Sequence, residues 1–168
     1  MQPEIMTVCY PINGAQIILG YKKVRLGAGL YNGFGGRLEV DEKIDTTAAR
    51  EFTEESGLKA EEIEKIGITL ITYESGERPI QLHLYLVSKF FGELKVTDEM
   101  DPKQFPLTEI PYEQMWQNEK FCLPLIIQRQ YFVGHFHYDS KASRKMLTNK
   151  IIALDHAPIP EDLNFITR

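Results

Sequence analysis

The sequence is poor in cysteine. Only Cys9 and Cys122 are present among 168 residues, and neither belongs to a Cys-x-x-Cys motif or lies at metal-ligand spacing from a histidine. A zinc site is therefore not expected, and a domain of this size needs no disulfide framework. We interpret both thiols as buried core side chains. The four histidines also lack a metal-binding pattern, and alternating His135 and His137 are more typical of a structural pair on a strand.

An excess of basic residues is also missing. The chain has 19 Lys and Arg against 24 Asp and Glu, for a formal net charge of -5 at pH 7. Because phosphate backbones select basic surfaces, this balance argues against a nucleic-acid polymer as the main partner. A single nucleotide held through metal ions remains compatible with it.

Long apolar runs are absent. No stretch approaches the roughly 18 apolar residues that span a bilayer, so no membrane partner is expected. Residues 1–6 lack the basic and apolar regions of a signal peptide, which makes the cytosol the expected compartment. The composition, 43% hydrophobic and 26% charged, is typical of one globular domain with a hydrophobic core.

The first half of the chain predicts strands followed by a helix. Asn13-Gly14 is a strong hairpin signal and joins two predicted strands within residues 6–19. Residues 27–36 contain five glycines and predict a loop around a short strand. A helix is predicted over residues 43–56, with Asp45 near its start and Gly57 as the left-handed residue that ends it.

The second half repeats this order. A turn over residues 74–79 separates predicted strands, and a second long helix is predicted over residues 112–131, kinked or broken at Pro124. The order favours an α+β fold with a mixed sheet between helices over a doubly wound parallel sheet. Residues 155–168 predict a tail without a clear role in the fold. The further predicted strands cover residues 66–73, 80–90, 104–107, 131–138 and 150–154.

Carboxylates cluster in the first helix. Glu51, Glu54 and Glu55 stand at i, i+3 and i+4 and share one helix face. At about 5 Å and an effective dielectric of about 20, each pair of like charges costs roughly 3 kcal/mol before screening. A hard divalent cation would neutralise such a cluster. The segment thus predicts a metal-dependent enzyme acting on phosphates, whereas a solvated acidic face is the usual interpretation of an isolated charge run.

The residues before the helix fit the same chemistry. Glu42 and Arg50 are spaced to form an ion pair if the preceding loop folds back, which would brace the loop against the helix. Glycines before Glu42 allow close backbone approach, and a carbonyl there could supply another oxygen ligand.

The complete pattern resembles a known motif. A glycine, five residues, Glu42, seven residues and Arg50-Glu51-x-x-Glu54-Glu55-x-Gly57 occur without substitution, and the span from residue 36 to residue 58 resembles the Nudix box. Residues 27–36, 98–100 and 110–116 are similar to the MutT-type Nudix hydrolases that act on oxidised purine nucleoside triphosphates. The resemblance covers roughly residues 5–154.

This resemblance implies a fold, a reaction and a metal. The fold would be an αβα sandwich with a mixed sheet, formed by residues 1–154. A metal-activated water would attack a nucleoside triphosphate and release the monophosphate and pyrophosphate, which sanitises the purine nucleotide pool. The metal would be Mg²⁺, with Mn²⁺ as a substitute. Its implied ligands are the Gly35 carbonyl and the catalytic glutamates Glu51, Glu54, Glu55 and Glu99.

Two assignments within this site stay open. Glu99 would complete the metal site or act in water activation. Either Glu55 or Glu99 is the first candidate for the general base. The remaining box positions, with structural roles, are Gly36, Glu42, Arg50 and Gly57.

The resemblance also implies a base pocket. Asn32 would contact the purine, and Trp116, the single tryptophan, would stack on the base. A turn-forming asparagine and a buried core tryptophan are the structural alternatives. The other implied lining residues, each of which could equally be ordinary packing or a solvated strand end, are Thr7, Lys22, Leu26, Ile71, Tyr73 and Ile80.

One departure concerns the base. The relatives have a proline and two adjacent aspartates after the tryptophan, where this chain has Gln117, Asn118 and Glu119. A carboxyl pair accepts or, when protonated, donates, whereas Asn118 offers a fixed donor and acceptor. We therefore expect Asn118 and Glu119 to bind the base with an altered ranking of purine triphosphates.

Two other functions are compatible with the sequence. One is a Nudix hydrolase of another nucleoside or pterin diphosphate-linked substrate. The other is a non-catalytic Nudix module that binds a nucleotide and regulates a partner, which would be expected to have lost box glutamates. The preferred ribose is left open, and a monomer is expected.

Overall fold

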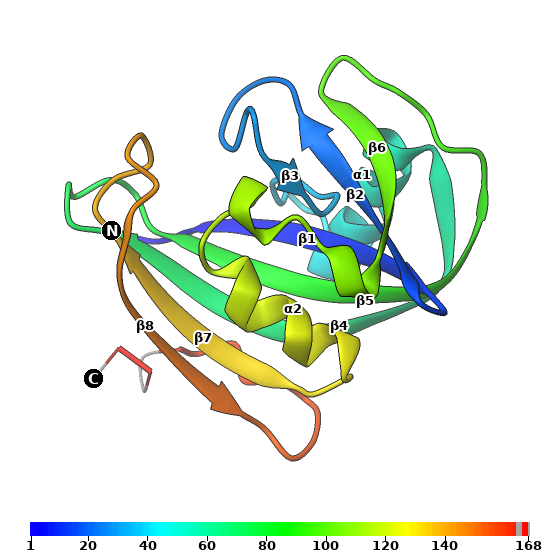
Figure 1. Cartoon of the computed structure of the whole chain (residues 1–168). Coiled ribbons are helices and arrows are strands. Elements are labelled where there is room, and N and C mark those ends of the chain that lie inside the picture. Colours follow the sequence, from blue (N-terminus) through cyan, green and yellow to red (C-terminus); the bar gives the residue numbers. More distant parts are fainter. Residues whose placement is uncertain (164–165, 168) are drawn as a thin grey trace.

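A mixed β-sheet forms the centre of the protein (Figure 1). The computed structural model describes residues 1–163 and 166–167. Its helices are α1 (Ile44–Ser56) and α2 (Glu119–Ile127). The strands are β1 (Glu4–Asn13), β2 (Gln16–Lys22), β3 (Tyr31–Asn32), β4 (Leu58–Tyr73), β5 (Ile80–Gly92), β6 (Met100–Pro106), β7 (Phe132–Tyr138) and β8 (Met146–Ala153).

Both parallel and antiparallel pairs occur in this sheet. The order is β3-β2-β1-β5-β4-β7-β8, with β6 paired to β2. The β1–β5 and β4–β7 pairs are parallel, and the remaining pairs are antiparallel. The predicted α+β fold with a mixed sheet is confirmed, as is the hairpin at Asn13-Gly14.

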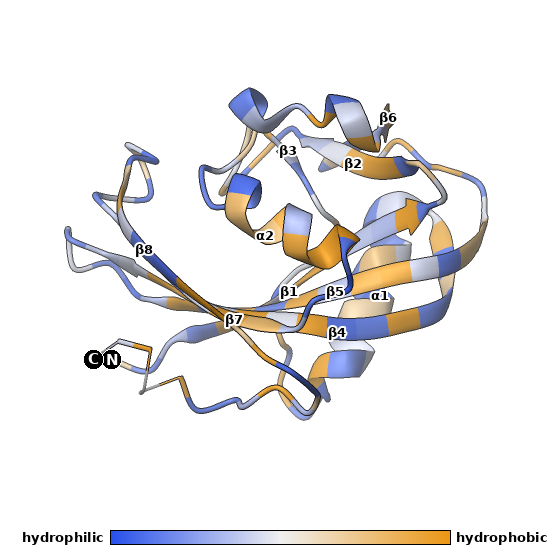
Figure 2. Cartoon of the chain, turned by 60° about the horizontal axis from the view of Figure 1, so that its bottom comes forward, coloured by the Kyte–Doolittle hydropathy of each residue, from blue (hydrophilic) through white to orange (hydrophobic). Residues whose placement is uncertain are grey.

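The two helices cover opposite faces of the sheet (Figure 2). Helix α1 buries Ala48 and Phe52 in one hydrophobic cluster, four residues apart on one face. Helix α2 buries Cys122, Leu123 and Ile126 in a larger cluster on the other face. Both cysteines are buried, as predicted. Among the described residues, no helix is long and apolar enough to cross a membrane.

The end of α1 follows from one glycine. Gly57 has a φ of 81° and its N–H donates to the Thr53 carbonyl at 2.9 Å. This left-handed residue stops the helix where the sequence predicted. Strand β4 begins at the next residue, eight residues earlier than predicted. The charged side chains within residues 59–65 hide the strand pattern of this first part of β4. It pairs with β5 through several register shifts.

The predicted second long helix is wrong. Residues 112–114 form only a short 3₁₀ turn, and α2 covers residues 119–127. Pro124 lies inside α2 and removes one backbone donor, and the helix ends three residues later. Strands β6 and β8 begin at residues 100 and 146, each four residues earlier than predicted.

The C-terminal segment has a role in the core, contrary to prediction. Ile159, Leu163 and Ile166 are buried against Ile68 and Val133 of the sheet. The segment lies on the α1 side of the sheet (Figure 2). The expectation failed because its apolar residues are dispersed among prolines and acids, without helix or strand periodicity.

Candidate active site

A cavity opens where β1 and β2 separate. The two strands pair only at Ile12–Ile17 and Asn13–Gln16. Residues 33–38 occupy the freed edge of β1, with the Cys9 N–H donating to the Phe34 carbonyl at 2.7 Å. The cavity beside them has a volume of about 1120 Å³, which is enough for a ligand with both a ring system and charged groups.

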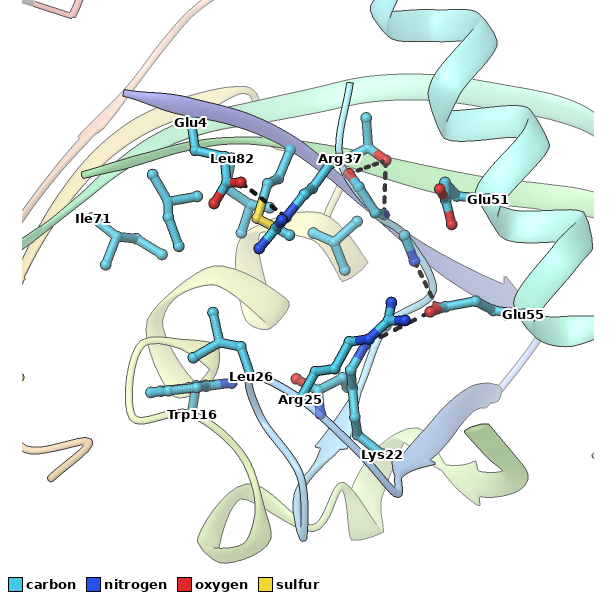
Figure 3. A pocket seen from close by; sticks show the side chains of 18 of the residues that line it. Glu4, Lys22, Arg25, Leu26, Arg37, Glu51, Glu55, Ile71, Leu82 and Trp116 are labelled. Atoms are coloured by element: carbon cyan, nitrogen blue, oxygen red, sulfur yellow. Dashed lines mark hydrogen bonds and ion pairs between the residues drawn. The ribbon is translucent and has the colours of Figure 1, made fainter. Parts of the chain in front are cut away.

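The predicted catalytic carboxylates meet at one end of this cavity. Glu51, Glu54 and Glu55 come from α1, and Glu99 comes from the loop before β6. Figure 3 shows Glu51 and Glu55 on the side away from Trp116. The helix spacing and the long return of the chain to Glu99 therefore place all four carboxylates around one space.

Burial changes the ionisation of two of these glutamates. It raises the pKa of Glu55 to about 7, against the opposing charge of Lys22, and the charges of Glu51 and Glu99 raise it further. Burial also raises the pKa of Glu51, although the Arg50 guanidinium opposes this shift. The carboxylates thus repel one another in a partly dry environment.

Two glycines allow the loop to approach the helix. The Gly35 N–H donates to Glu55 Oε2 at 3.0 Å. A Cβ at Gly35 would lie 1.9 Å from the Thr7 carbonyl oxygen, and one at Gly36 would lie 2.4 Å from the Glu51 carboxyl carbon. Only glycine fits at either position, because any side chain would displace backbone or a site carboxylate.

Arg50 braces the loop against α1, as predicted. Its Nε and Nη2 bond both oxygens of Glu42, at 2.8 and 3.0 Å, and lower the pKa of Glu42 to about 2. Its Nη1 bonds Glu51 at 2.9 Å and Glu54 at 3.1 Å. One guanidinium therefore orients three carboxylates at once.

The other two carboxylates also have cationic partners. Lys22 Nζ lies 3.7 Å from Glu55 Oε1, and Arg25 Nη1 lies 3.1 Å from Glu99 Oε1. Both basic side chains line the cavity between its two ends (Figure 3). Arg25 had not been predicted, because a single arginine in a glycine-rich loop carries no distinctive spacing.

The donor set fits a hard divalent cation. Clustered carboxylate oxygens that raise one another's pKa are ligands that such an ion would neutralise. Within the described part of the chain, no three acidic, histidine or cysteine side chains are already grouped as metal ligands. A cation bound here would compete with Lys22 for Glu55 and with Arg25 for Glu99.

The predicted base-pocket residues all line the same cavity. Trp116 and Leu26 lie together at the end opposite Glu55 (Figure 3). Asn32 also reaches the cavity, while its Nδ2 donates to the Leu30 carbonyl at 3.0 Å, as a turn-forming asparagine does. The other predicted residues on the cavity wall are Thr7, Lys22, Ile71, Tyr73, Ile80, Asn118 and Glu119.

Two buried tyrosines contact the polar residues of this end. The Tyr10 hydroxyl donates to Glu119, at 2.8 and 2.9 Å from its two oxygens. The Tyr138 hydroxyl donates to Asn118 Oδ1 at 2.7 Å. Burial raises the pKa of Glu119 to about 7, although the Tyr10 hydrogen bond opposes this. Neither tyrosine was predicted as a site residue, because the only signal of each is strand alternation toward the α2 face.

The loop between β7 and β8 supports Trp116 from another side. Arg144 lies 5.4 Å from the Trp116 ring and donates to the Ala28 carbonyl at 2.8 Å. The Met146 N–H donates to Gln117 Oε1 at 2.7 Å. Arg144 was also missed, since it is 28 residues from the tryptophan in the chain.

The histidine pair lies outside the cavity lining. His135 Nε2 and His137 Nδ1 each lie 2.8 Å from Thr72 Oγ1, which links β7 to β4. The pair thus makes cross-strand contacts, as expected for structural histidines.

Comparison with known proteins identifies the family. The NUDIX domain model matches residues 4–125. The chain belongs to the Nudix family. Nudix hydrolases generally use divalent metal ions, in agreement with the donor set at the acidic end.

Relatives of this Nudix protein occur among vertebrate enzymes. It is 33% identical to an oxidized purine nucleoside triphosphate hydrolase of Danio rerio, over 80% of this chain and 86% of the relative. It is 31% identical to the protein of the same name from Mus musculus, over 82% and 88%. The fold matches the crystal structure of a MutT protein from Bacillus halodurans with a TM-score of 0.78, 23% identity and coverage of 88% and 97%.

Proposed function

We propose that this Nudix protein is a Mg²⁺-dependent hydrolase of purine nucleoside triphosphates, oxidised purines included, that releases the monophosphate and pyrophosphate. One observation carries the proposal: the box carboxylates and the single tryptophan line opposite ends of one cavity. This separation suits a ligand with phosphates at one end and an aromatic base at the other. The names of the zebrafish and mouse relatives support the same substrate class.

The acidic end would hold the metal. Its ligands would be the carboxylates of Glu51, Glu54, Glu55 and Glu99 and the Gly35 carbonyl. When bound, Mg²⁺ or Mn²⁺ polarises phosphate oxygens and lowers the pKa of a coordinated water. Arg50 would keep the box carboxylates oriented. Lys22 and Arg25, whose carboxylate partners would hold the cation, would then be available to pair with phosphate oxygens.

Glu55 and Glu99 are the candidates for the general base. Glu55 is buried in the acidic end, where the Gly35 N–H donates to its Oε2 at 3.0 Å and Lys22 Nζ lies 3.7 Å from its Oε1, so its carboxyl is held in one place. Glu99 enters from outside the helix and faces the same space. At the other end, Trp116 would stack on the base while Asn32, Asn118 and Glu119 would bond its edge.

A pyrophosphate-release assay tests this function. With Mg²⁺, we expect release from purine nucleoside triphosphates, and a loss of roughly 100-fold or more in Glu55→Gln, as for removal of a general base or metal ligand. Glu61→Gln is the matched control, because Glu61 is half-exposed on β4 and pairs with Lys89 at 3.3 Å, outside the cavity.

The outcomes separate the competing functions. Hydrolysis of diphosphate-linked compounds without hydrolysis of triphosphates would indicate the alternative Nudix substrate class. Binding without release from any nucleotide would indicate a non-catalytic module and contradict the proposal. A panel of oxidised and normal dGTP and dATP, with their ribose forms, then gives the ranking of substrates.

We also propose the setting in which the enzyme acts. Residues 1–154 would form the catalytic domain, with residues 155–168 as a C-terminal segment. The protein would act as a cytosolic monomer without a nucleic-acid or membrane partner. Its net charge of -5 supports the expectation that it does not bind a nucleic-acid polymer. Size-exclusion chromatography with light scattering tests the oligomeric state, and a stable dimer would contradict it.

A further inference from the structure

The hydroxyl of Tyr138 binds one cavity residue twice. It donates to Asn118 Oδ1 at 2.7 Å and accepts the Asn118 backbone N–H at 3.2 Å. Both residues are almost fully buried, with exposed fractions of 1% and 3%. The ring of Tyr138 also meets Trp116 edge-on, with centroids 5.8 Å apart. Tyr138 therefore contacts both the tryptophan and the polar residue at this end of the cavity.

These contacts determine which atoms Asn118 offers. Asn118 precedes α2 in the N-cap position, yet its side chain makes no capping hydrogen bond, unlike most asparagines there. Its oxygen is turned to Tyr138 instead, where it accepts the hydroxyl hydrogen bond. An amide nitrogen carries two N–H groups. The polar group left for a ligand is therefore the amide nitrogen, a donor.

Glu119, next to Asn118, offers hydrogen-bond acceptors instead of a donor. Its carboxyl accepts the single hydroxyl hydrogen of Tyr10, and it has no ion-pair partner among the side chains that the structure describes. Above its pKa of about 7, Glu119 is a carboxylate with about four acceptor sites, so most of them remain for a ligand. Asn118 and Glu119 together present a donor next to an acceptor at the cavity wall.

We propose that Tyr138 determines base specificity: by holding the Asn118 oxygen, it makes this end of the cavity select 6-oxopurines over 6-aminopurines. A 6-oxopurine has an acceptor at O6 beside a donor at N1, which complements Asn118 and Glu119. A 6-aminopurine has the reverse order and would leave buried donors facing each other. This inference rests on the proposed function, because it assumes that the base lies against Trp116.

Binding of monophosphates without metal tests the inference apart from catalysis. Trp116 is the single tryptophan, so its fluorescence reports occupancy of this end. At pH 8, where the Glu119 carboxyl is mostly ionised, we expect dGMP to bind wild type at least about tenfold more tightly than dAMP, the discrimination of one good hydrogen-bonded pair. In Tyr138→Phe the freed amide can rotate, and the ratio should fall to roughly threefold or less.

Two further variants complete the design. Asn118→Asp replaces the amide donor by a second carboxylate oxygen and should move the ratio toward dAMP, so the inference remains testable if Tyr138→Phe does not fold. Tyr85→Phe is the matched control, since Tyr85 is a buried tyrosine whose hydroxyl donates to Asp45 at 2.5 Å. It lies outside the cavity lining and should keep the wild-type ratio.

The kinetics add a second readout. For Tyr138→Phe, the ratio of the kcat/KM values for dGTP and dATP should decrease. This decrease should come from changes in KM, with kcat for dGTP within about threefold of wild type. A folded Tyr138→Phe protein that keeps the wild-type binding ratio, or wild type that prefers dAMP, would overturn the inference. Selective binding of dGMP without hydrolysis of any triphosphate would instead overturn the proposed function and leave base selection supported.

Discussion

Glu55 and Glu119 show how single residues set the charge at the two ends of the cavity. Burial raises the pKa of each to about 7. Glu55 has Lys22 at 3.7 Å, whereas the hydrogen-bond partner of the Glu119 carboxyl among the described residues is the neutral Tyr10 hydroxyl. A buried carboxylate without a cation is destabilising. The expected effect is a stability that depends on the charge of Glu119.

The first prediction is the pH dependence of Glu119→Gln stability. Glu119 has a folded pKa of about 7 against an ordinary value of 4.5, so between these values the folded state binds more protons than the unfolded chain. The free energy of unfolding of wild type therefore falls as pH rises through this window. Glutamine does not titrate. From pH 5 to pH 8 the variant should gain about 3 kcal/mol relative to wild type.

Urea denaturation of both proteins at several pH values measures this difference. Comparing variant with wild type cancels the titration of other groups, such as His83, whose burial lowers its pKa to about 4. A difference in unfolding free energy that stays constant from pH 5 to pH 8 would contradict the assigned shift.

At the scale of elements, loops connect parts of the site that are distant in the chain. Arg50 joins the loop before α1 to the helix. The β7–β8 loop joins Trp116 to the glycine-rich loop through Arg144, whose own backbone is left-handed with a φ of 56°. Such a backbone is unfavourable for arginine and occurs here in a turn, where the Arg144 N–H donates to the Ser140 carbonyl at 3.2 Å.

The second prediction concerns the β7–β8 loop. Arg144→Ala removes the contact with Trp116 and the hydrogen bond to Ala28, so Trp116 becomes less ordered. We expect KM for purine triphosphates to rise about three- to tenfold, the effect of roughly 1 kcal/mol. Because the acidic end is unchanged, kcat should stay within about twofold.

Steady-state kinetics measure this effect, with Arg129→Ala as the control. Arg129 also has a left-handed backbone, with a φ of 54°, but lies beyond the end of α2 and outside the cavity lining. An equal rise of KM in both variants, or a fall in kcat confined to Arg144→Ala, would contradict this role of the loop.

At the scale of the whole molecule, the C-terminal segment completes one face of the sheet. Ile159, Leu163 and Ile166 cover Ile68 and Val133, and Glu161 reaches Lys65 at 3.8 Å. The cavity is bordered by other parts of the chain. Stability and chemistry are therefore carried by different regions.

The third prediction follows from this separation. Leu163→Ala should lower the free energy of unfolding by about 3 kcal/mol, as for a buried leucine, while kcat and KM stay near wild type below the unfolding temperature. Leu94→Ala, at a leucine that is 45% exposed, should change stability by about 0.5 kcal/mol or less. Thermal and urea unfolding, combined with pyrophosphate release, measure both effects. Equal destabilisation by the two changes would contradict the packing of the segment.

The sequence by itself determined the features that depend on near neighbours. The period of a helix places Glu51, Glu54 and Glu55 on one face, and Glu42 lies just before α1, close enough to bond Arg50 along the first turns of the helix. Gly57 ends α1 because a left-handed residue is needed there. These are local constraints, which the residues carry wherever the fold places them.

Only the tertiary structure decided what faces those residues. The separation of β1 from β2 creates the cavity, while a hairpin signal alone predicts continuous pairing. The fold brings together residues that are far apart in the sequence: Tyr138 contacts Asn118, and Arg144 contacts Ala28. It also buries Leu163 against the sheet. Such contacts depend on strand order and on side-chain direction across the sheet, neither of which has a local period to reveal it. The acidic end was therefore predictable from one segment, whereas the atoms offered to the base were not.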